Sequence, residues 1–191
     1  MLNKLSDFIE YFLLSMGIFA PIFSCLLIVV ESMLPILPLC VFITINFYYF
    51  GSLFGFLISY IFTCLGSFTS YILVKKGIKI LAINSAKKTG FLNKAIKIIK
   101  KIEFPTLVTI IAIPFTPAFM VNIAAGLAKI DTKKYILSLL IGKIFMVYFW
   151  GFIGLSLIES LKNPYILIKV IIMVIIAYLI AIITKKYIKE N

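Results

Sequence analysis

The sequence predicts an all-α integral membrane protein, built as an inverted repeat with two opposed re-entrant hairpins and about four transmembrane helices. Three observations predict this fold class. Hydrophobic residues make up 63% of the 191 residues and charged residues only 14%, whereas roughly half and roughly a quarter are typical of soluble domains. The lysines gather in short segments between long apolar runs, as topology-determining charges do. Two of these runs each contain a Pro-x-x-Pro motif, which interrupts a helix.

The first half of the chain is expected to contain four segments. In order, they are an interfacial helix at 1–16, a span at 17–34, a re-entrant hairpin at 35–50 and a span at 51–74. The first span has 18 residues, near the lower limit for crossing a hydrocarbon core of about 30 Å. The hairpin segment carries two prolines and is too short to cross, whereas the last segment is an uninterrupted run of 24 residues.

The second half is expected to repeat this order after a polar connection. Its segments are a cytoplasmic basic amphipathic loop at 75–103, a re-entrant hairpin at 104–130, spans at 132–158 and 164–184, and a cytoplasmic tail at 185–191. The loop contains nine lysines. Five of its apolar residues share one face of a helix: Leu92, Ala95, Ile96, Ile99 and Ile102. This pattern favours a helix on an anionic membrane surface, and a solvated connector is the alternative. Asp131 is placed to cap the helix that follows it.

The distribution of lysines predicts the topology. Lysine-rich loops face the cytoplasm, so residues 75–101, 129–134 and 185–189 are expected on that side. The apolar segment between the first two loops must then dip into the membrane and return, and residues 35–50 dip from the opposite side. The expected location is a bacterial cell membrane with both termini in the cytoplasm.

The four prolines of the two motifs are candidate site residues. Pro35 and Pro38 interrupt the first run, and Pro114 and Pro117 interrupt the second. Each proline leaves the carbonyl four residues earlier without its helical donor, and such carbonyls are tolerated at membrane depth only where protein or a wet cavity satisfies them. The paired motifs therefore indicate a site between two inverted halves, although two proline pairs can also coincide by chance.

Two charged residues within apolar runs are further candidates. Glu31 is the one acid in the first run, and Lys143 lies ten residues after Lys133, which is about 15 Å along a helix and near the middle of a bilayer. A charge at that depth is expected to face the bundle interior and to find a partner. We expect Glu31 and Lys143 to pair. The alternatives place Glu31 at the outer interface and let Lys143 reach water.

A stripe of small residues predicts helix packing in the span at 51–74. Its members recur every four residues: Gly51, Gly55, Ser59, Thr63 and Ser67. Small side chains on one face let another helix approach closely. This stripe is a packing feature without chemistry of its own.

The composition argues against several function classes. The chain has no histidine, and it lacks a nucleophile-elbow serine, paired carboxylates and a metal-ligand cluster, so an enzyme, a metal site or a cofactor is not expected. Its three cysteines are widely spaced in apolar sequence and are expected to be free thiols. The net charge of +12 is explained by loops beside an anionic leaflet, so nucleic acid is not an expected partner.

Several motifs resemble the DedA superfamily, also called the SNARE-associated Golgi protein or VTT-domain family. In the first half these are Glu31, Pro35, Pro38, Gly51, Gly55, Gly66, Tyr71, Lys75 and Gly77. In the second half they are Pro114-Phe115-Thr116-Pro117, Asn122, Ala125-Gly126-Leu127, Lys129, Tyr135 and Gly142. The second half is similar to the Golgi and VTT branch more than to DedA proper. The resemblance covers roughly residues 17–158.

The resemblance implies two opposed re-entrant hairpins and movement of lipids between leaflets, by a phospholipid scramblase or a flippase-like transporter of carrier lipids. It implies membrane lipids as partners, an anionic phospholipid or a polyprenyl phosphate, and it leaves a homo-oligomer open. Asn122 and Gly126 enter the candidate site through it; Asn122 is expected either to bond the freed carbonyls of the second hairpin or to act as a plain packing amide. The alternative function is a non-transporting structural or assembly factor.

The sequence departs from the DedA pattern at its charged positions. Leu39-Cys40 stands where DedA proper has a second acid, Ile111 occupies the position of an arginine, and Pro117 occupies that of another. Proton coupling by the DedA mechanism is therefore not implied. Lys143 is expected to supply the missing positive charge from another helix.

Overall fold

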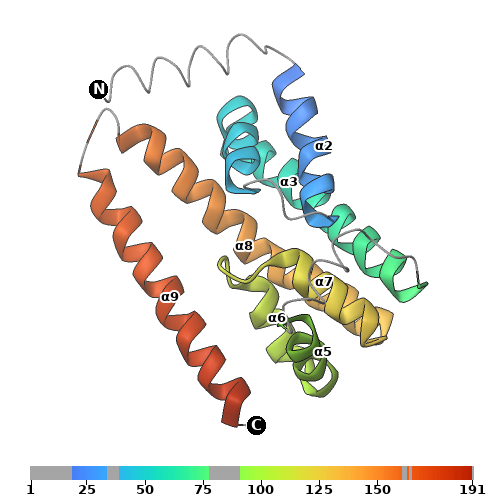
Figure 1. Ribbon diagram of the computed structural model, residues 1–191. Coiled ribbons are helices and arrows are strands. Elements are labelled where there is room, and N and C mark those ends of the chain that lie inside the picture. The colour runs from blue at the N-terminus through green and yellow to red at the C-terminus, as the bar shows by residue number, and fades with distance from the viewer. Residues whose placement is uncertain (1–18, 34–38, 78–90, 161–162, 164, 191) are drawn as a thin grey trace.

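The computed structural model describes residues 19–33, 39–77, 91–160, 163 and 165–190. Within these ranges the regular structure is helical (Figure 1). The helices are α2 (Phe19–Met33), α3 (Leu39–Lys75), α5 (Phe91–Lys101), α6 (Phe104–Ala112), α7 (Ala118–Leu127), α8 (Thr132–Ser160) and α9 (Ile166–Glu190). The interfacial helix expected at 1–16 lies outside the described residues, as do Pro35 and Pro38.

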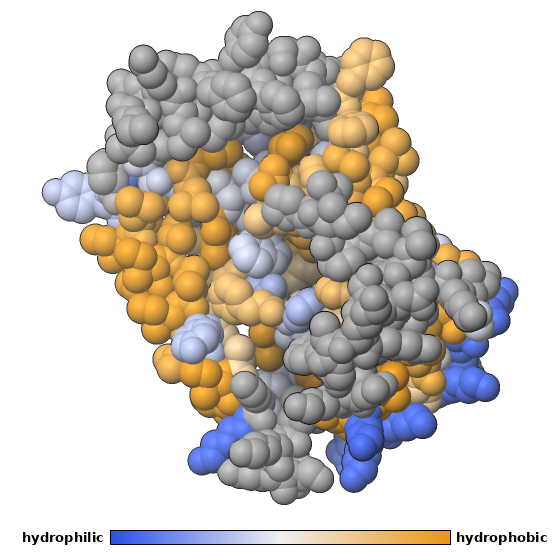
Figure 2. All heavy atoms as spheres, in the orientation of Figure 1, coloured by the Kyte–Doolittle hydropathy of each residue, from blue (hydrophilic) through white to orange (hydrophobic). Residues whose placement is uncertain are grey.

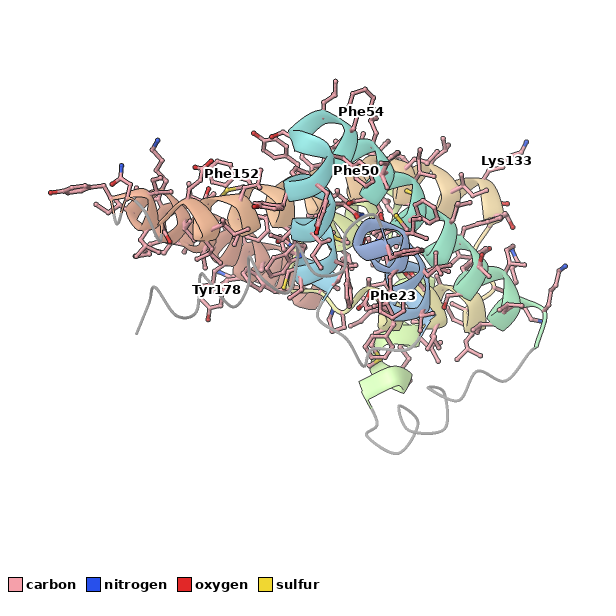
Figure 3. All side chains as sticks on the ribbon, turned by 90° about the horizontal axis from the view of Figure 1, so that it is seen from above. Phe23, Phe50, Phe54, Lys133, Phe152 and Tyr178 are labelled. Carbon is pink, nitrogen blue, oxygen red and sulfur yellow. The ribbon has the colours of Figure 1, made fainter. Side chains whose placement is uncertain are left out.

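The helices have the lengths and surfaces of an integral membrane protein. Among the described residues, Leu39–Lys75, Thr132–Ser160 and Ile166–Thr184 are long and apolar enough to cross a membrane, and α2 and α7 contain shorter apolar stretches. Apolar side chains cover the middle of the molecule, and hydrophilic ones gather at its lower end (Figure 2). Phe23 and Phe54 point away from the bundle, as Lys133 does at one end (Figure 3). The expectation of an all-α membrane protein is confirmed.

Helix α3 is two helices joined by a reversal at Gly51. This glycine has φ 74° and ψ 173°, a backbone conformation that residues with a Cβ rarely adopt. A Cβ on Gly55 would lie 2.5 Å from the Phe47 Cα, although residues eight apart in a straight helix are about 12 Å apart. The chain therefore turns back on itself at Gly51. No atom lies within 4 Å of the position that a Cβ of Gly51 would take. The assignment of Gly51 to the packing stripe is therefore wrong: this glycine is needed for the backbone reversal and not for helix packing.

The first hairpin consists of α2 and residues 39–50. Ser24 of α2 donates a hydrogen bond to Asn46, and the Asn46 amide lies 3.9 Å from Cys25 Sγ, so the two segments run antiparallel. The structure thus divides the chain differently from the expected span at 17–34 followed by a hairpin at 35–50: these segments are two arms of one hairpin.

The second hairpin consists of α6 and α7, with its apex at 113–117. Helix α6 ends before Pro114, and Pro117 is the N-cap residue of α7. The carbonyl of Ile113 accepts a hydrogen bond from the Thr116 N–H at 3.1 Å. The expectation that Pro117 leaves this carbonyl unpaired is therefore wrong, because a tight turn replaces the helical bond.

The two halves are related as an inverted repeat through glycine contacts. Each half is a hairpin followed by a long helix, residues 52–75 of α3 in the first and α8 in the second (Figure 1). Each long helix packs on the first arm of its own hairpin: Gly66 lies against Ser32 of α2, and Gly142 against Ile111 of α6. Gly66 and Gly142 therefore occupy equivalent places.

Each long helix also packs on the second arm of the other hairpin. Gly126 of α7 lies against Tyr71 of α3, and Gly151 of α8 lies against the ring of Phe47. Any larger residue would push these helices apart, since close helix approach in a membrane depends on small side chains. Each long helix therefore contacts both hairpins.

The basic helix α5 packs against the protein with its apolar face. Ile99 is only 3% exposed and belongs to the core cluster with Val121 of α7, and Ile96 and Ile102 pack against that cluster. The exposed face carries Lys97, Lys100 and Lys101. The predicted amphipathic face is confirmed for these isoleucines, and it is covered by α7.

Asp131 caps α8, as the sequence predicts. Its Oδ1 accepts a hydrogen bond from the Lys134 N–H at 2.9 Å, and its backbone carbonyl accepts one from the Tyr135 N–H at 3.0 Å. The pKa of this exposed carboxyl is lowered, mainly by the hydrogen bond from the Lys134 N–H. A backbone hydrogen bond from Lys133 and the positive charge of Lys75 lower it further. The stabilisation it provides is present above the ordinary pKa of about 3.9 and is lost as pH falls through the lowered value.

We expect Asp131→Ala to lower the thermal stability of the protein at neutral pH and Asp131→Asn to keep most of it, because asparagine also caps helices. The difference between wild type and Asp131→Ala should become smaller in acid, because protonation removes the charge but leaves an acceptor oxygen, whereas the advantage of Asp131→Asn over Asp131→Ala should not depend on pH. Thermal unfolding in detergent at neutral and acidic pH measures both differences. A cap effect of wild type that is equally large at neutral pH and in strong acid would contradict the role of the negative charge.

Candidate functional site

The two charged candidates lie at the meeting point of the hairpins. Glu31, in the last turn of α2, is 9% exposed, and Lys143, in the middle of α8, is 1% exposed. The two side chains are close enough for the charge of each to act on the other. Both side chains are therefore buried among the helices, as the sequence predicts.

Glu31 lines a cavity of about 220 Å³ where α2, the start of α3, the second hairpin and α8 meet. One wall is the apex of the second hairpin with both of its prolines, and the other walls come from α3 and α8. The remaining lining residues are Leu39, Cys40, Pro114, Phe115, Thr116, Pro117, Ala118, Met146 and Trp150. The cavity is thus built from three segments far apart in the sequence.

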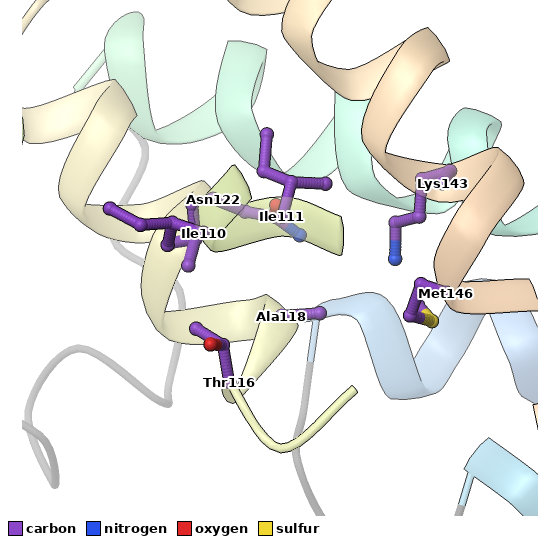
Figure 4. Close-up of a pocket in the computed structure, with 8 residues that line it drawn as sticks. Ile110, Ile111, Thr116, Ala118, Asn122, Lys143 and Met146 are labelled. Atoms are coloured by element: carbon purple, nitrogen blue, oxygen red, sulfur yellow. The ribbon is translucent and has the colours of Figure 1, made fainter. Parts of the chain in front are cut away.

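Lys143 borders a second, smaller space of about 10 Å³. Its amino group is directed away from α8 into the space beside Thr116 of the apex and Ala118 at the start of α7 (Figure 4). Thr116, Ala118 and Met146 line both this space and the Glu31 cavity. The carboxylate and the ammonium therefore approach the same apex from two sides.

Both charged side chains have a buried atom without a hydrogen-bond partner among the described residues. Glu31 Oε2 and Lys143 Nζ are buried without a hydrogen-bond partner in the part of the chain that the structure describes. A buried charge without a partner costs several kcal/mol, and ionisable groups at membrane depth mark functional sites. The charges of Glu31 and Lys143 thus act on each other without a hydrogen bond between the two groups. The pairing of the two residues stays a prediction.

The position of Ile111 agrees with the expectation that Lys143 supplies the positive charge of the arginine found there in the DedA pattern. Ile111 is 8% exposed and lines the small space together with Lys143. The adjacent Gly142 lets α8 approach α6 at this level. The positive charge of Lys143 therefore lies in the same small space that Ile111 lines.

Asn122 links the two hairpins through hydrogen bonds. Its Nδ2 donates to the carbonyl of Ser32 at 3.3 Å, and its Oδ1 accepts from the Tyr135 hydroxyl at 2.8 Å. Ser32 belongs to α2. Asn122 therefore bonds a backbone carbonyl of the first hairpin, and not one of its own hairpin as expected.

A stacked tyrosine pair connects this network to the lysine-rich end. The rings of Tyr71 and Tyr135 lie 4.0 Å apart at 14°. Lys75 Nζ donates to Tyr71 Oη at 2.8 Å, to the Ile130 carbonyl at 2.7 Å and to Thr132 Oγ1 at 2.9 Å. These bonds hold the end of α3 to the loop between α7 and α8.

The packing candidates lie where the small-residue stripe predicts, apart from Gly51. Gly55, Ser59, Thr63 and Ser67 are all buried. Ser59 has a polar role as well, because its hydroxyl accepts a hydrogen bond from Asn46 at 3.0 Å. Gly126 is also a packing residue: its Cβ position lies 2.8 Å from the Val74 side chain.

Sequence reasoning missed several residues of the cavity. Cys40, Phe115, Met146 and Trp150 line it, yet each is an apolar or weakly polar residue in an apolar run. Two of them carried a signal. Phe115 lies between the two prolines of its motif, and Cys40 belongs to the pair of residues that stands where DedA proper has a second acid. Pro114 and Pro117 line the cavity as expected.

Asn122→Ala is expected to lower stability by about 2 kcal/mol, because it leaves buried polar groups of two helices without partners. Tyr135→Phe should cost less, since it removes one hydroxyl. The double variant should differ from the sum of the two by at least about 0.5 kcal/mol. Unfolding in detergent measures the three values, and strict additivity would show that the bond between Asn122 and Tyr135 contributes nothing.

Comparisons with known proteins agree with this architecture. The VTT domain matches residues 34–156, which is more than half of the chain. A relative from Bacillus subtilis (strain 168), named "Uncharacterized membrane protein YhjE", is 29% identical over 168 residues, covering 88% of this chain and 80% of that protein. No solved structure matches the chain.

Proposed function

This chain belongs to the VTT-domain family, the superfamily of DedA and SNARE-associated Golgi proteins, and we propose that it moves lipids between the two leaflets of a membrane. The observation that carries the proposal is the cavity beside the apex of the second hairpin, next to which Glu31 Oε2 and Lys143 Nζ are buried without hydrogen-bond partners among the described residues. Such groups are retained where a ligand satisfies them in the working cycle.

The chemistry of the cavity suits a phosphate-bearing headgroup. A polar headgroup crossing hydrocarbon loses its hydration at a high free-energy cost. A lysine binds phosphate oxygens through a charge-assisted bond, so Lys143 lowers that cost halfway across. Glu31 occupies the opposite side of the same apex and repels the anion, which keeps the bound state short-lived. The substrate class is an anionic phospholipid or a polyprenyl phosphate, and the proposed role is not enzymatic.

The proposed location is a bacterial cell membrane with the lysine-rich end in the cytoplasm. This end carries the exposed Lys76, Lys129 and Lys133, and α9 also ends there (Figure 1), so the C-terminus would be cytoplasmic. Single cysteines at 44 and 115, labelled from each side in a cysteine-free background, test the arrangement. Opposed hairpins predict access from opposite sides; labelling of both from one side would contradict it.

Reconstitution tests the proposed function directly. Purified protein in phosphatidylcholine vesicles with a trace of fluorescent phosphatidylglycerol or fluorescent polyprenyl phosphate should expose inner-leaflet label to a membrane-impermeant quencher. The matched control is Glu159→Gln, which removes an exposed acid on α8 and should transport as wild type does. If neither lipid moves faster than in protein-free vesicles, the proposal is wrong.

A further inference from the structure

An apolar groove of about 280 Å³ adjoins the polar cavity on the side that faces α9. Its walls come from three helices and the apex of the second hairpin. Among its lining residues are Thr109 and Ala112 of α6, Phe145 and Tyr148 of α8, and Met173 and Ile176 of α9. Phe145, Tyr148 and Ile176 are 60%, 58% and 52% exposed, so the groove is open along its length.

The groove exists because α9 touches the bundle along a narrow seam. Of the described α9 residues, Val170 and Ala177 are buried, and they pack against Phe149 and Ile153 of α8. Ile176 and Ile180 of the same helix are exposed and line the groove. Helix α9 follows the residues that match the VTT domain. One wall of the groove therefore comes from a helix that is not part of the matched domain.

Groove and polar cavity share a wall. Pro114 lines both. Phe115 and Trp150 line the cavity, Phe149 lines the groove, and the three rings meet edge to face with centroids 5.3 to 6.2 Å apart. Three aromatic rings and one proline therefore separate an apolar groove from a cavity beside two buried charges.

This juxtaposition matches the two parts of one lipid. We propose that the groove between α6, α8 and α9 binds a hydrocarbon chain of the lipid whose phosphate headgroup enters the Glu31 cavity, with the Phe115–Phe149–Trp150 cluster between them. The inference rests on the proposed function and deepens it by assigning a chain site. A hydrocarbon chain suits this lining, because a groove of Ile, Met, Phe and Ala side chains binds apolar surface without cost in desolvation.

Two neighbouring isoleucines of α9 provide a matched test. Ile176 lines the groove and is 52% exposed, whereas Ile175 does not line it and is 51% exposed. Ile176→Trp should fill the groove and slow the movement of fluorescent phosphatidylglycerol by about tenfold or more, while Ile175→Trp should stay within about twofold of wild type. Equal rates for the two variants, with an active wild type, would overturn the chain site.

A binding measurement separates this inference from the proposed function. Phosphatidylglycerol with a photoreactive group on its acyl chain should crosslink to residues 109–114 of the wild type and of Ile175→Trp in detergent micelles, and far less to Ile176→Trp. If this pattern is found but no lipid moves, the chain site stands and the transport function falls. Crosslinking of residues 109–114 that Ile176→Trp leaves unchanged shows that the groove holds no chain.

Discussion

The double variant Glu31→Gln/Lys143→Met is expected to be more stable than either single variant. Removing one charge leaves the other buried at membrane depth, and breaking a buried pair costs roughly 3–5 kcal/mol. Because no hydrogen bond joins the two groups, we expect each single change to cost about 3 kcal/mol, at the lower end of that range. Removing both leaves no stranded charge, so the double variant should recover most of the loss.

Transport should not recover with stability. Lys143 is the group that binds phosphate in the proposed mechanism, so Lys143→Met and the double variant should both move labelled lipid near the rate of protein-free vesicles. Lys169→Met removes an exposed lysine of α9 and should leave both stability and transport unchanged. Unfolding in detergent and the vesicle assay give the two readouts. Strictly additive stability effects of the two single changes would show that the residues are not coupled.

Gly55→Ala is expected to abolish folding or to cost at least about 3 kcal/mol, the upper end of overpacking effects. Its Cβ would lie 2.5 Å from Phe47 Cα, 2.6 Å from the Asn46 carbonyl oxygen and 2.7 Å from the Phe47 nitrogen. These are backbone atoms, so the two parts of α3 must separate. That movement also strains the bonds of Asn46 to Ser59 and Ser24. Gly55→Leu should be worse.

The matched control is Ser52→Ala, at an exposed position one turn earlier on the same helix, which should unfold at the wild-type temperature. Yield of monodisperse protein and thermal unfolding measure the effect. Normal stability of Gly55→Ala would mean that the reversal at Gly51 does not bring the two segments into contact.

Comparison with Glu31→Gln separates the proposed transporter from the alternative of a structural or assembly factor. A transporter that needs the carboxylate loses lipid movement in Glu31→Gln, including in the fraction that folds. For a structural factor the glycine contacts matter more, so Gly55→Leu should harm function far more than Glu31→Gln. The specific activity of folded protein, rather than its yield, distinguishes the two.

Much of the candidate site could be predicted because its signals are local. Proline removes a hydrogen-bond donor wherever it stands, so Pro114 and Pro117 mark the apex of the second hairpin without knowledge of its neighbours. Counting 1.5 Å per residue from Lys133 places Lys143 in the interior, and the capping role of Asp131 follows from the next three residues. These inferences depend on backbone geometry over about one to three helical turns.

Other features depend on contacts that the sequence does not encode locally. The apolar run around Glu31 fits a span as well as a hairpin arm, and only the pairing of Ser24 with Asn46 identifies the arm. Gly51 continues a regular stripe of small residues, but its φ of 74° makes it a hinge. The partner of Asn122 lies 90 residues away.

The sequence by itself determined the membrane class, the apex of the second hairpin and the two charges in the interior, because each follows from composition, proline chemistry or helical rise. The tertiary structure decided which helices face one another and therefore which residues line the cavity and the groove. The physical reason lies in the solvent. In water, an apolar stripe shows which face of a helix is buried, but in lipid both the buried and the exposed faces are apolar. Trp150 in the cavity wall and Ile175 on the lipid side therefore look alike in the sequence, and only packing tells them apart.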